Sequence, residues 1–161
     1  MIAKRNTRAL FIVIGVLIIM LIIIISFYNL YNSNYTNDQK GQENINIEFE
    51  GIVNYVIDGD TLDINDNRIR LSLINTPERG QEGYMEAKDF VKNLCLNKKG
   101  QVDIDDGQRR GDRYGREVGV VYCDGINLNK ALIKNNLAVI YSEYCEISEF
   151  SNKEWAKPYC H

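Results

Sequence analysis

The stretch IEFEGIVNYVIDGDTLDINDNRIRLSLINTPE, residues 47–78, decides the fold. Turn signals at Asp58-Gly59 and Asp66-Asn67 divide it into three extended segments rich in β-branched and aromatic residues, at 47–57, 61–65 and 68–74. In the third segment, basic or polar side chains alternate with apolar ones, which is typical of a strand with one buried face. Three successive strands with short connections predict a β-meander.

The rest of this half of the chain alternates between helical and extended patterns. Apolar spacing predicts a first helix over 83–97 and a second over 128–136, and a short final helix is expected over 148–155. Two further strands are predicted, one around Val102 and Ile104 and one over 118–122. The order favours an α+β fold, a five-stranded OB-like Greek-key β-barrel with three helices.

The N-terminal region differs from this globular part. Residues 9–28 are uncharged and apolar, and at a rise of ~1.5 Å per residue such a helix spans a hydrocarbon core of roughly 30 Å. We therefore expect a transmembrane anchor, with a cleaved signal peptide as the alternative. The basic residues of segment 1–8 predict a cytoplasmic N-terminus, followed after the anchor by a polar flexible linker, 29–45, and an extracytoplasmic domain, 46–161.

Net charge limits how a polyanion could be bound. The chain carries a formal charge of −3, and leaving out Lys4, Arg5 and Arg8 of the N-terminal segment gives −6. A domain this acidic repels phosphate overall. A nucleic-acid partner would therefore have to be held by a local basic patch or a metal ion.

Four cysteines follow the predicted anchor, where disulfides persist if the domain is exported. Cys95 precedes the fourth predicted strand and Cys123 follows the fifth, so an antiparallel pairing of these strands would bring the two thiols together. Cys145 and Cys160 would then form a second bridge. Zinc binding is disfavoured because the sequence has no C-x-x-C pair and its one histidine is His161.

That single histidine also disfavours Ser-His-Asp or Cys-His catalysis, so a general base has to be a carboxylate. Asp58 and Asp60 flank a glycine at a turn, a spacing that can present hard oxygen ligands to Ca²⁺ or Mg²⁺, although such turns are often only solvated hairpins. If the end of the third strand returns beside the second, then Asn75, Thr76 and Glu78 face Asp60.

Two arginines could bind phosphate beside those carboxylates. Arg70 lies on the third strand, and Arg116 ends the basic loop GQRRGDRYGR, residues 107–116. A guanidinium can contact phosphate oxygens in a bidentate way. The alternative for this loop is a solvated charged turn without a binding role.

Three segments together carry a family resemblance: VIDGDTLDI at 56–64, IRLSLINTPE at 69–78 and DRYGREVGVVYCDG at 112–125. In this order and at these separations they resemble the thermonuclease, or staphylococcal-nuclease-like, family, over about residues 51–138. The resemblance implies the barrel fold and a calcium-dependent nuclease that cuts DNA and RNA and leaves 3′-phosphate ends.

The resemblance also implies a role for each matching residue. Asp60 would be a calcium ligand, Thr76 would offer its backbone carbonyl, and Asn75 stands where the family often has a ligating aspartate. The remaining implied roles are general base for Glu78, phosphate binding for Arg70 and Arg116, substrate binding for Tyr114 and Arg113, and an acid beside the ligands for Asp58. An amide oxygen brings no charge, so Asn75 predicts weaker calcium binding.

The sequence thus predicts a membrane-anchored, monomeric, calcium-dependent nuclease acting outside the cytoplasm, with no protein partner. The main alternative is a weakly active or inactive membrane-tethered module that binds nucleic acid or protein. A third hypothesis is an OB-like domain that recognises saccharide or assembles an envelope complex. Four late aromatic residues could stack on bases, but core packing is the favoured interpretation: Tyr141, Tyr144, Phe150 and Trp155.

Overall fold

The computed structural model describes residues 11–17, 19–26 and 45–160. The chain divides into two compact units, Met1–Asn44 and Ile45–His161. In the first unit, residues 11–17 and 19–26 are helical. Within the described ranges, no helix combines the length and apolar character needed to cross a membrane. The predicted basic end, 1–8, and all of the predicted linker except Ile45 lie outside the described residues.

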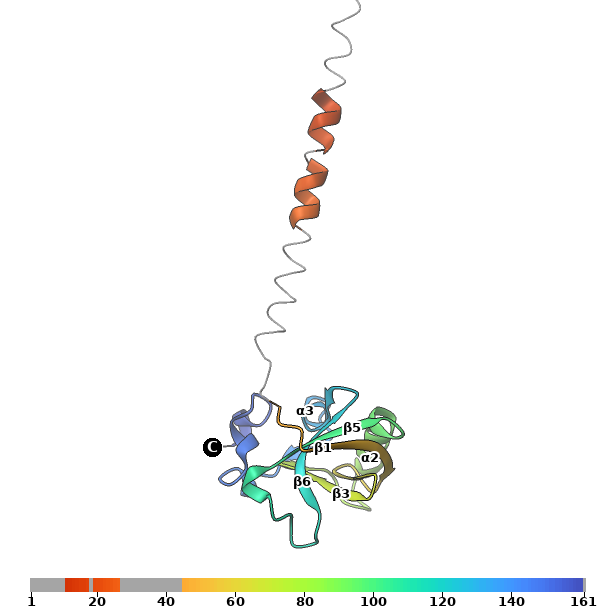
Figure 1. Ribbon diagram of the computed structural model, residues 1–161, viewed down its shortest axis with the longest axis vertical. Coiled ribbons are helices and arrows are strands. Elements are labelled where there is room, and N and C mark those ends of the chain that lie inside the picture. The colour runs from red at the N-terminus through yellow and green to blue at the C-terminus, as the bar shows by residue number, and fades with distance from the viewer. Residues whose placement is uncertain (1–10, 18, 27–44, 161) are drawn as a thin grey trace, which may run out of the picture. The chain divides into compact units, whose positions relative to one another are not determined.

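The second unit is built on a closed five-stranded barrel (Figure 1). Its strands are β1 (Phe49–Val56), β2 (Thr61–Ile64), β3 (Asn67–Leu71), β5 (Lys99–Ile104) and β6 (Glu117–Cys123). β1 pairs antiparallel with β2 and β5, β2 with β3, and β5 with β6. A parallel pairing of β3 with β6 closes the barrel. The predicted meander and the predicted five-stranded barrel are confirmed.

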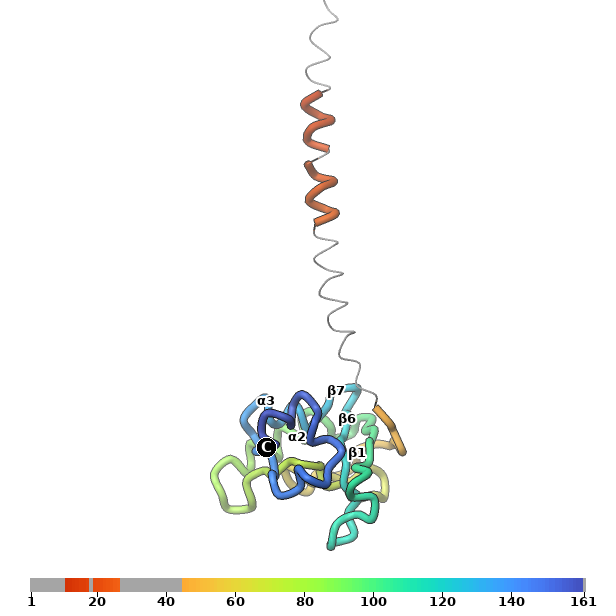
Figure 2. Tube along the Cα trace, turned by 90° about the vertical axis from the view of Figure 1, so that its left-hand side faces the viewer, coloured from red at the N-terminus to blue at the C-terminus, as the bar shows by residue number. Residues whose placement is uncertain are grey.

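Smaller elements cover the barrel (Figure 2). The helices are α2 (Tyr84–Cys95) and α3 (Leu128–Lys134), and two-residue strands are β4 (Ile74–Asn75), β7 (Ile126–Asn127) and β8 (Val139–Ile140). Four short 3₁₀ helices complete the unit: η1 (Asp106–Gln108), η2 (Ser142–Tyr144), η3 (Glu149–Asn152) and η4 (Lys157–Tyr159).

The structure corrects two predicted boundaries. The third strand does not run unbroken to Ile74, because Leu73 has a positive φ of 59° and the strand is interrupted between β3 and β4. The final helix is the short 3₁₀ helix η3 and does not reach Trp155. The Ser148 side chain caps its start by accepting a hydrogen bond from Phe150 N, and extended backbone at Lys153 ends it.

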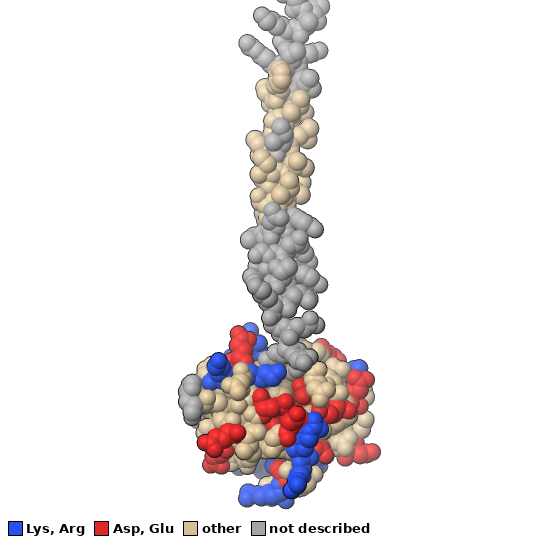
Figure 3. All heavy atoms as spheres, turned by 60° about the vertical axis from the view of Figure 1, so that its left-hand side comes forward, with Lys and Arg blue, Asp and Glu red and all other residues tan. Residues whose placement is uncertain are grey.

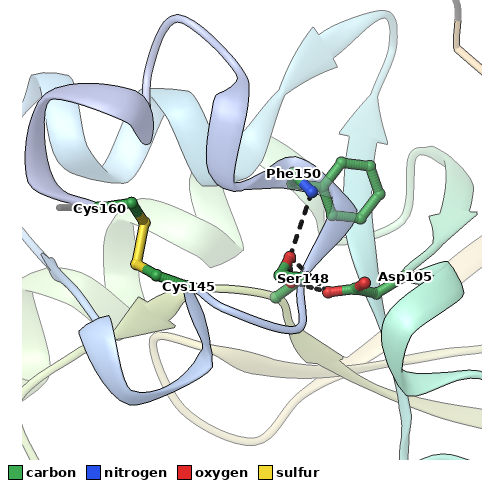
Figure 4. The surroundings of a disulfide bond; sticks show 6 residues. Asp105, Cys145, Ser148, Phe150 and Cys160 are labelled. Carbon is green, nitrogen blue, oxygen red and sulfur yellow. Dashed lines mark hydrogen bonds between the residues drawn. A yellow bond between two sulfur atoms is a disulfide. The ribbon is translucent and has the colours of Figure 1, made fainter.

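Both predicted disulfides are present. Cys95 at the end of α2 is bonded to Cys123 at the end of β6, and both are fully buried. Cys145 is bonded to Cys160 in the C-terminal segment (Figure 4). Phe150 and Trp155 belong to the barrel core, as the favoured interpretation predicted.

Candidate active site

The turn between β1 and β2 presents the first carboxylates. Asp58 Oδ1 accepts a hydrogen bond from Asp60 N at 3.1 Å, which fixes the turn locally. A Cβ atom on Gly59 would lie 2.8 Å from side-chain atoms of Thr76 and Ala87, so only glycine allows this close approach. The turn is thereby packed against the end of β4.

Asp60 is the centre of the site and is only 6% exposed. Its Oδ2 accepts hydrogen bonds from the backbone N and the Oγ1 of Thr76, both at 2.9 Å. Its Oδ1 lies 3.3 Å from Arg70 Nη1 and 3.2 Å from Thr61 Oγ1. The chain after β3 therefore does return beside the start of β2, as expected from the meander.

The two predicted phosphate-binding arginines converge on this centre. Arg116 donates to Thr61 Oγ1 at 3.2 Å, and Thr61 in turn contacts Asp60. Asp112 holds Arg116 from the other side, with contacts of 2.6 Å to Nε and 2.5 Å to Nη2. Burial opposes the charge of Asp112, but hydrogen bonds from Arg116 and from Tyr114 N lower its pKa overall. Arg116 is thus held at both ends of its guanidinium.

Asn75 and Glu78, three residues apart in the chain, are the next two predicted site residues. Asn75 ends β4 and is half-buried, whereas Glu78 is exposed in the following loop. The backbone N of Glu78 donates to Gln81 Oε1 at 2.8 Å, which fixes the main chain there. In the described part of the chain, no hydrogen bond or ion pair engages the Glu78 carboxylate, so it is available to bind water.

Tyr114 is the exposed aromatic group of the basic loop, with 66% of its surface accessible. The guanidinium carbons of Arg113 and Arg116 lie 4.8 Å and 5.2 Å from its ring centre. Such cation–π contacts orient the ring without covering it completely. The two guanidinium groups thus place positive charge beside the exposed Tyr114 ring.

All of the predicted site residues except Thr76 line one cleft of about 850 Å³. Its charged lining includes Asp58, Asp60, Glu78, Arg70 and Arg116. Figure 3 shows Lys and Arg gathered at the lower edge of the domain, where the loop projects in Figure 1, below acidic surface. Because the domain is acidic overall, binding a nucleic acid would need a local basic patch or a metal ion. The basic residues at this edge provide such a patch.

The lining of the cleft also contains two aromatic residues for which the sequence favours core packing, and Tyr144 does pack partly against the core. Tyr141 and Tyr144 line the cleft, with ring centres 4.9 Å apart and an interplanar angle of 78°. Tyr141 N donates to Leu73 O, which brings the segment after β8 beside β4. The cleft position of Tyr141 depends on the long-range pairing of β4 with β8. Local sequence periodicity does not reveal such a pairing, so the sequence carried no signal for it.

The donor set fits a hard cation. Burial, reinforced by the nearby charge of Asp60, raises the pKa of Asp58, so a cation beside these two carboxylates would relieve a real repulsion. The Asn75 amide adds a neutral oxygen. Across residues 45–160, no group of three or more His, Cys, Asp or Glu residues is placed to hold a metal ion. Of the three predicted ligands Asp60, Asn75 and Thr76, only Asp60 is charged, so the negative charge that they offer a cation is low.

Comparison with known proteins gives consistent matches. A sequence model described as "Staphylococcal nuclease homologue" matches residues 68–156. An uncharacterized endonuclease of Escherichia coli O157:H7 is 37% identical over 102 residues, which cover 60% of this chain and 64% of that protein. A micrococcal nuclease of Shigella flexneri is 30% identical over 123 residues, 68% of each chain. The chain thus spans less than two thirds of the length of the E. coli relative.

Proposed function

Because the chain belongs to the staphylococcal nuclease homologue family, we propose that it hydrolyses phosphodiester bonds of DNA and RNA in a calcium-dependent reaction. The observation that carries the proposal is the single cleft shared by Asp60, Glu78 and the two arginines Arg70 and Arg116. A charged base and two phosphate-binding groups around one cavity are what in-line attack by water on phosphorus requires.

Each side chain has a distinct part in the proposed reaction. Glu78 accepts the proton of the attacking water, since its carboxylate is free for this in the cleft. Arg70 and Arg116 bind the non-bridging oxygens and stabilise the charge that develops on them. Asp112 and Thr61 keep Arg116 oriented before substrate arrives. Tyr114 with Arg113 offers a stacking surface for a base.

Asp60, the Asn75 amide oxygen and the Thr76 carbonyl would hold the calcium ion, with Asp58 beside them. The ion would neutralise negative charge on the phosphate. Because Asn75 is neutral, we expect weaker calcium affinity than an aspartate would give at this position.

We further propose that the domain acts outside the cytoplasm, as a monomer anchored by residues 9–28 and tethered by residues 29–45. The two disulfides support an extracytoplasmic location, because such bonds persist in oxidising compartments. Products with 3′-phosphate ends are expected from the family resemblance.

A binding module without catalysis is the second candidate. It is favoured by one observation, that Asp60 is already engaged by Arg70 and Thr76 and so could serve only as a structural ion-pair partner. Loss of metal binding at Asn75 would fit this role.

One experiment separates the two candidates. The full chain, purified in detergent, is incubated with plasmid DNA or with RNA, in calcium or in chelator, beside Glu78→Gln. Glu82→Gln is the matched control, because Glu82 is also exposed and lies four residues away. Calcium-dependent cutting that Glu78→Gln abolishes and Glu82→Gln retains supports the nuclease. Retention of nucleic acid without cutting in any divalent cation favours the binding module.

A further inference from the structure

Asp105 is a fully buried carboxylate at the start of the arginine loop, defined here as residues 105–116. Within the described residues, no lysine or arginine forms an ion pair with it. Five donors surround it instead. Oδ2 accepts from Ser72 Oγ and Ser148 Oγ, both at 2.6 Å, and from Gln108 Nε2 at 3.0 Å. Oδ1 accepts from Gly107 N at 3.1 Å and Glu149 N at 3.2 Å.

These donors come from three separate parts of the chain. Ser72 lies at the joint between β3, which carries Arg70, and β4, which carries Asn75. Gly107 and Gln108 belong to the arginine loop itself. Ser148 and Glu149 belong to the cystine tail, defined here as residues 145–160, which the Cys145–Cys160 bond closes (Figure 4). The Asp105 carboxylate thus links the arginine loop, the β3–β4 connection of the barrel and the cystine tail through hydrogen bonds.

The loop and the tail touch at two more points. Asp106 N donates to Glu149 Oε1 at 2.7 Å. A Cβ atom on Gly107 would lie 1.7 Å from the carbonyl oxygen of Ile147, so the loop backbone rests directly on the tail backbone at a position that only glycine can occupy. The first residues of the loop are therefore supported by the tail as well as by the barrel.

The far half of the loop carries several of the groups that line the cleft, and most of its hydrogen bonds and ring contacts are made within the loop. The Asp112 carboxylate accepts hydrogen bonds from Tyr114 N, Arg116 N and Arg116 Nε, and the guanidinium groups of Arg113 and Arg116 both contact the Tyr114 ring. We infer that Ser148 and Glu149 are positioning residues for the arginine loop, through which the cystine tail holds Arg116 and Tyr114 at the cleft. The catalytic consequence rests on the proposed function, but the coupling between tail and loop does not.

Limited proteolysis tests the coupling without using nuclease activity. The full chain in detergent is treated with trypsin, and cleavage after the loop arginines is followed by mass spectrometry, with Lys88 in α2 as internal reference. Ser148→Ala is compared with Ser151→Ala, and Glu149→Ala with Glu146→Ala. Each control alters a residue of the same type in the same tail that has no side-chain bond to the loop. A variant lacking both Cys145 and Cys160, as serines, completes the set.

We expect loop cleavage to be about tenfold faster in Ser148→Ala, Glu149→Ala and the cystine variant, with Lys88 still protected, because local opening becomes easier. Loop rates equal to those of the controls would overturn the inference. If Ser148→Ala unfolds the domain, so that Lys88 is also cut, Glu149→Ala decides, since its side chain is exposed.

Kinetic measurements distinguish a positioning role of Ser148 from a general effect on the stability of the domain. Ser148→Ala should lower kcat/KM in the wild-type background and have a much smaller effect in Arg116→Ala, because Arg116 is then absent and only Tyr114 is left to be positioned. An equal fall in both backgrounds contradicts positioning. If no variant or wild type cuts nucleic acid, the proposed function fails while the proteolysis result still stands.

Discussion

Arg70 and Asp60 form an ion pair inside the cleft, with Arg70 Nη1 3.3 Å from Asp60 Oδ1 and both side chains mostly buried. The pair joins a proposed phosphate-binding group to a proposed calcium ligand. Neither residue can therefore be changed without altering the electrostatic surroundings of the other.

Arg70→Ala should lower kcat/KM for DNA on the order of a hundredfold or more, because a buried donor to the transition state is lost. Arg70→Lys should restore little of it, since an ammonium cannot reproduce two-point contact. Arg68→Ala is the matched control, two residues earlier on β3, where the arginine pairs with Asp63 at the surface. Steady-state kinetics on single-stranded DNA measures this. Equal losses in the Arg68 and Arg70 variants would refute a specific role for Arg70.

Asn75→Asp should strengthen calcium binding by about tenfold, because it adds a third negative charge near Asp58 and Asp60. Without calcium the same charge adds repulsion in a half-buried place, so the melting temperature should fall in chelator and recover on calcium addition. Calorimetric titration and thermal denaturation with and without calcium provide the two readouts. A variant that melts lower with no gain from calcium would show that position 75 does not contact the ion.

Local pattern was enough to predict the barrel strands, because alternation along β3 and turn chemistry at Asp58-Gly59 are short-range signals. Part of the site could also be predicted, because a meander returns the end of the third strand to the start of the second. That return brings Thr76 into hydrogen-bond contact with Asp60. Two features of the site could not be predicted from the sequence. At the break between β3 and β4, Ser72 donates a hydrogen bond to Asp105, thirty-three residues away, and Tyr141 follows the strand β8, which pairs with β4. Both depend on distant partners, which periodicity cannot identify.

Removing the buried Cys95–Cys123 bridge, by replacing both residues with serine, should lower the free energy of unfolding by ~2 to 4 kcal/mol. The bond closes a sequence separation of 28 between the end of α2 and the end of β6. Two buried hydroxyls in the core add to the loss. Urea denaturation measures the change. An unchanged midpoint would mean that the bridge contributes nothing to the folded state, in contrast to the tail bridge, whose expected effect is local.

Asp103 should make stability depend on pH. It lies on β5, is 4% exposed, and accepts one hydrogen bond from Asn46 N. Burial, with the negative charges of Glu149 and Glu48, raises its pKa to about 6. An unfolded aspartate titrates near pH ~3.9. Between these values the folded state binds the proton and the unfolded state does not, so the free energy of unfolding falls as pH rises through this window.

Asp103→Asn should therefore raise the free energy of unfolding at pH 7 by about 1 to 3 kcal/mol, because the amide keeps the shape without the buried charge. At pH 4 the variant and the wild type should have nearly equal stability. Asp66→Asn, in an exposed turn, is the control and should change little at either pH. Urea denaturation at pH 4, 5, 6 and 7 measures the difference. A constant gap between variant and wild type across this range would show that Asp103 does not titrate there, and that the buried carboxylate is stabilised by its surroundings in the ionised form.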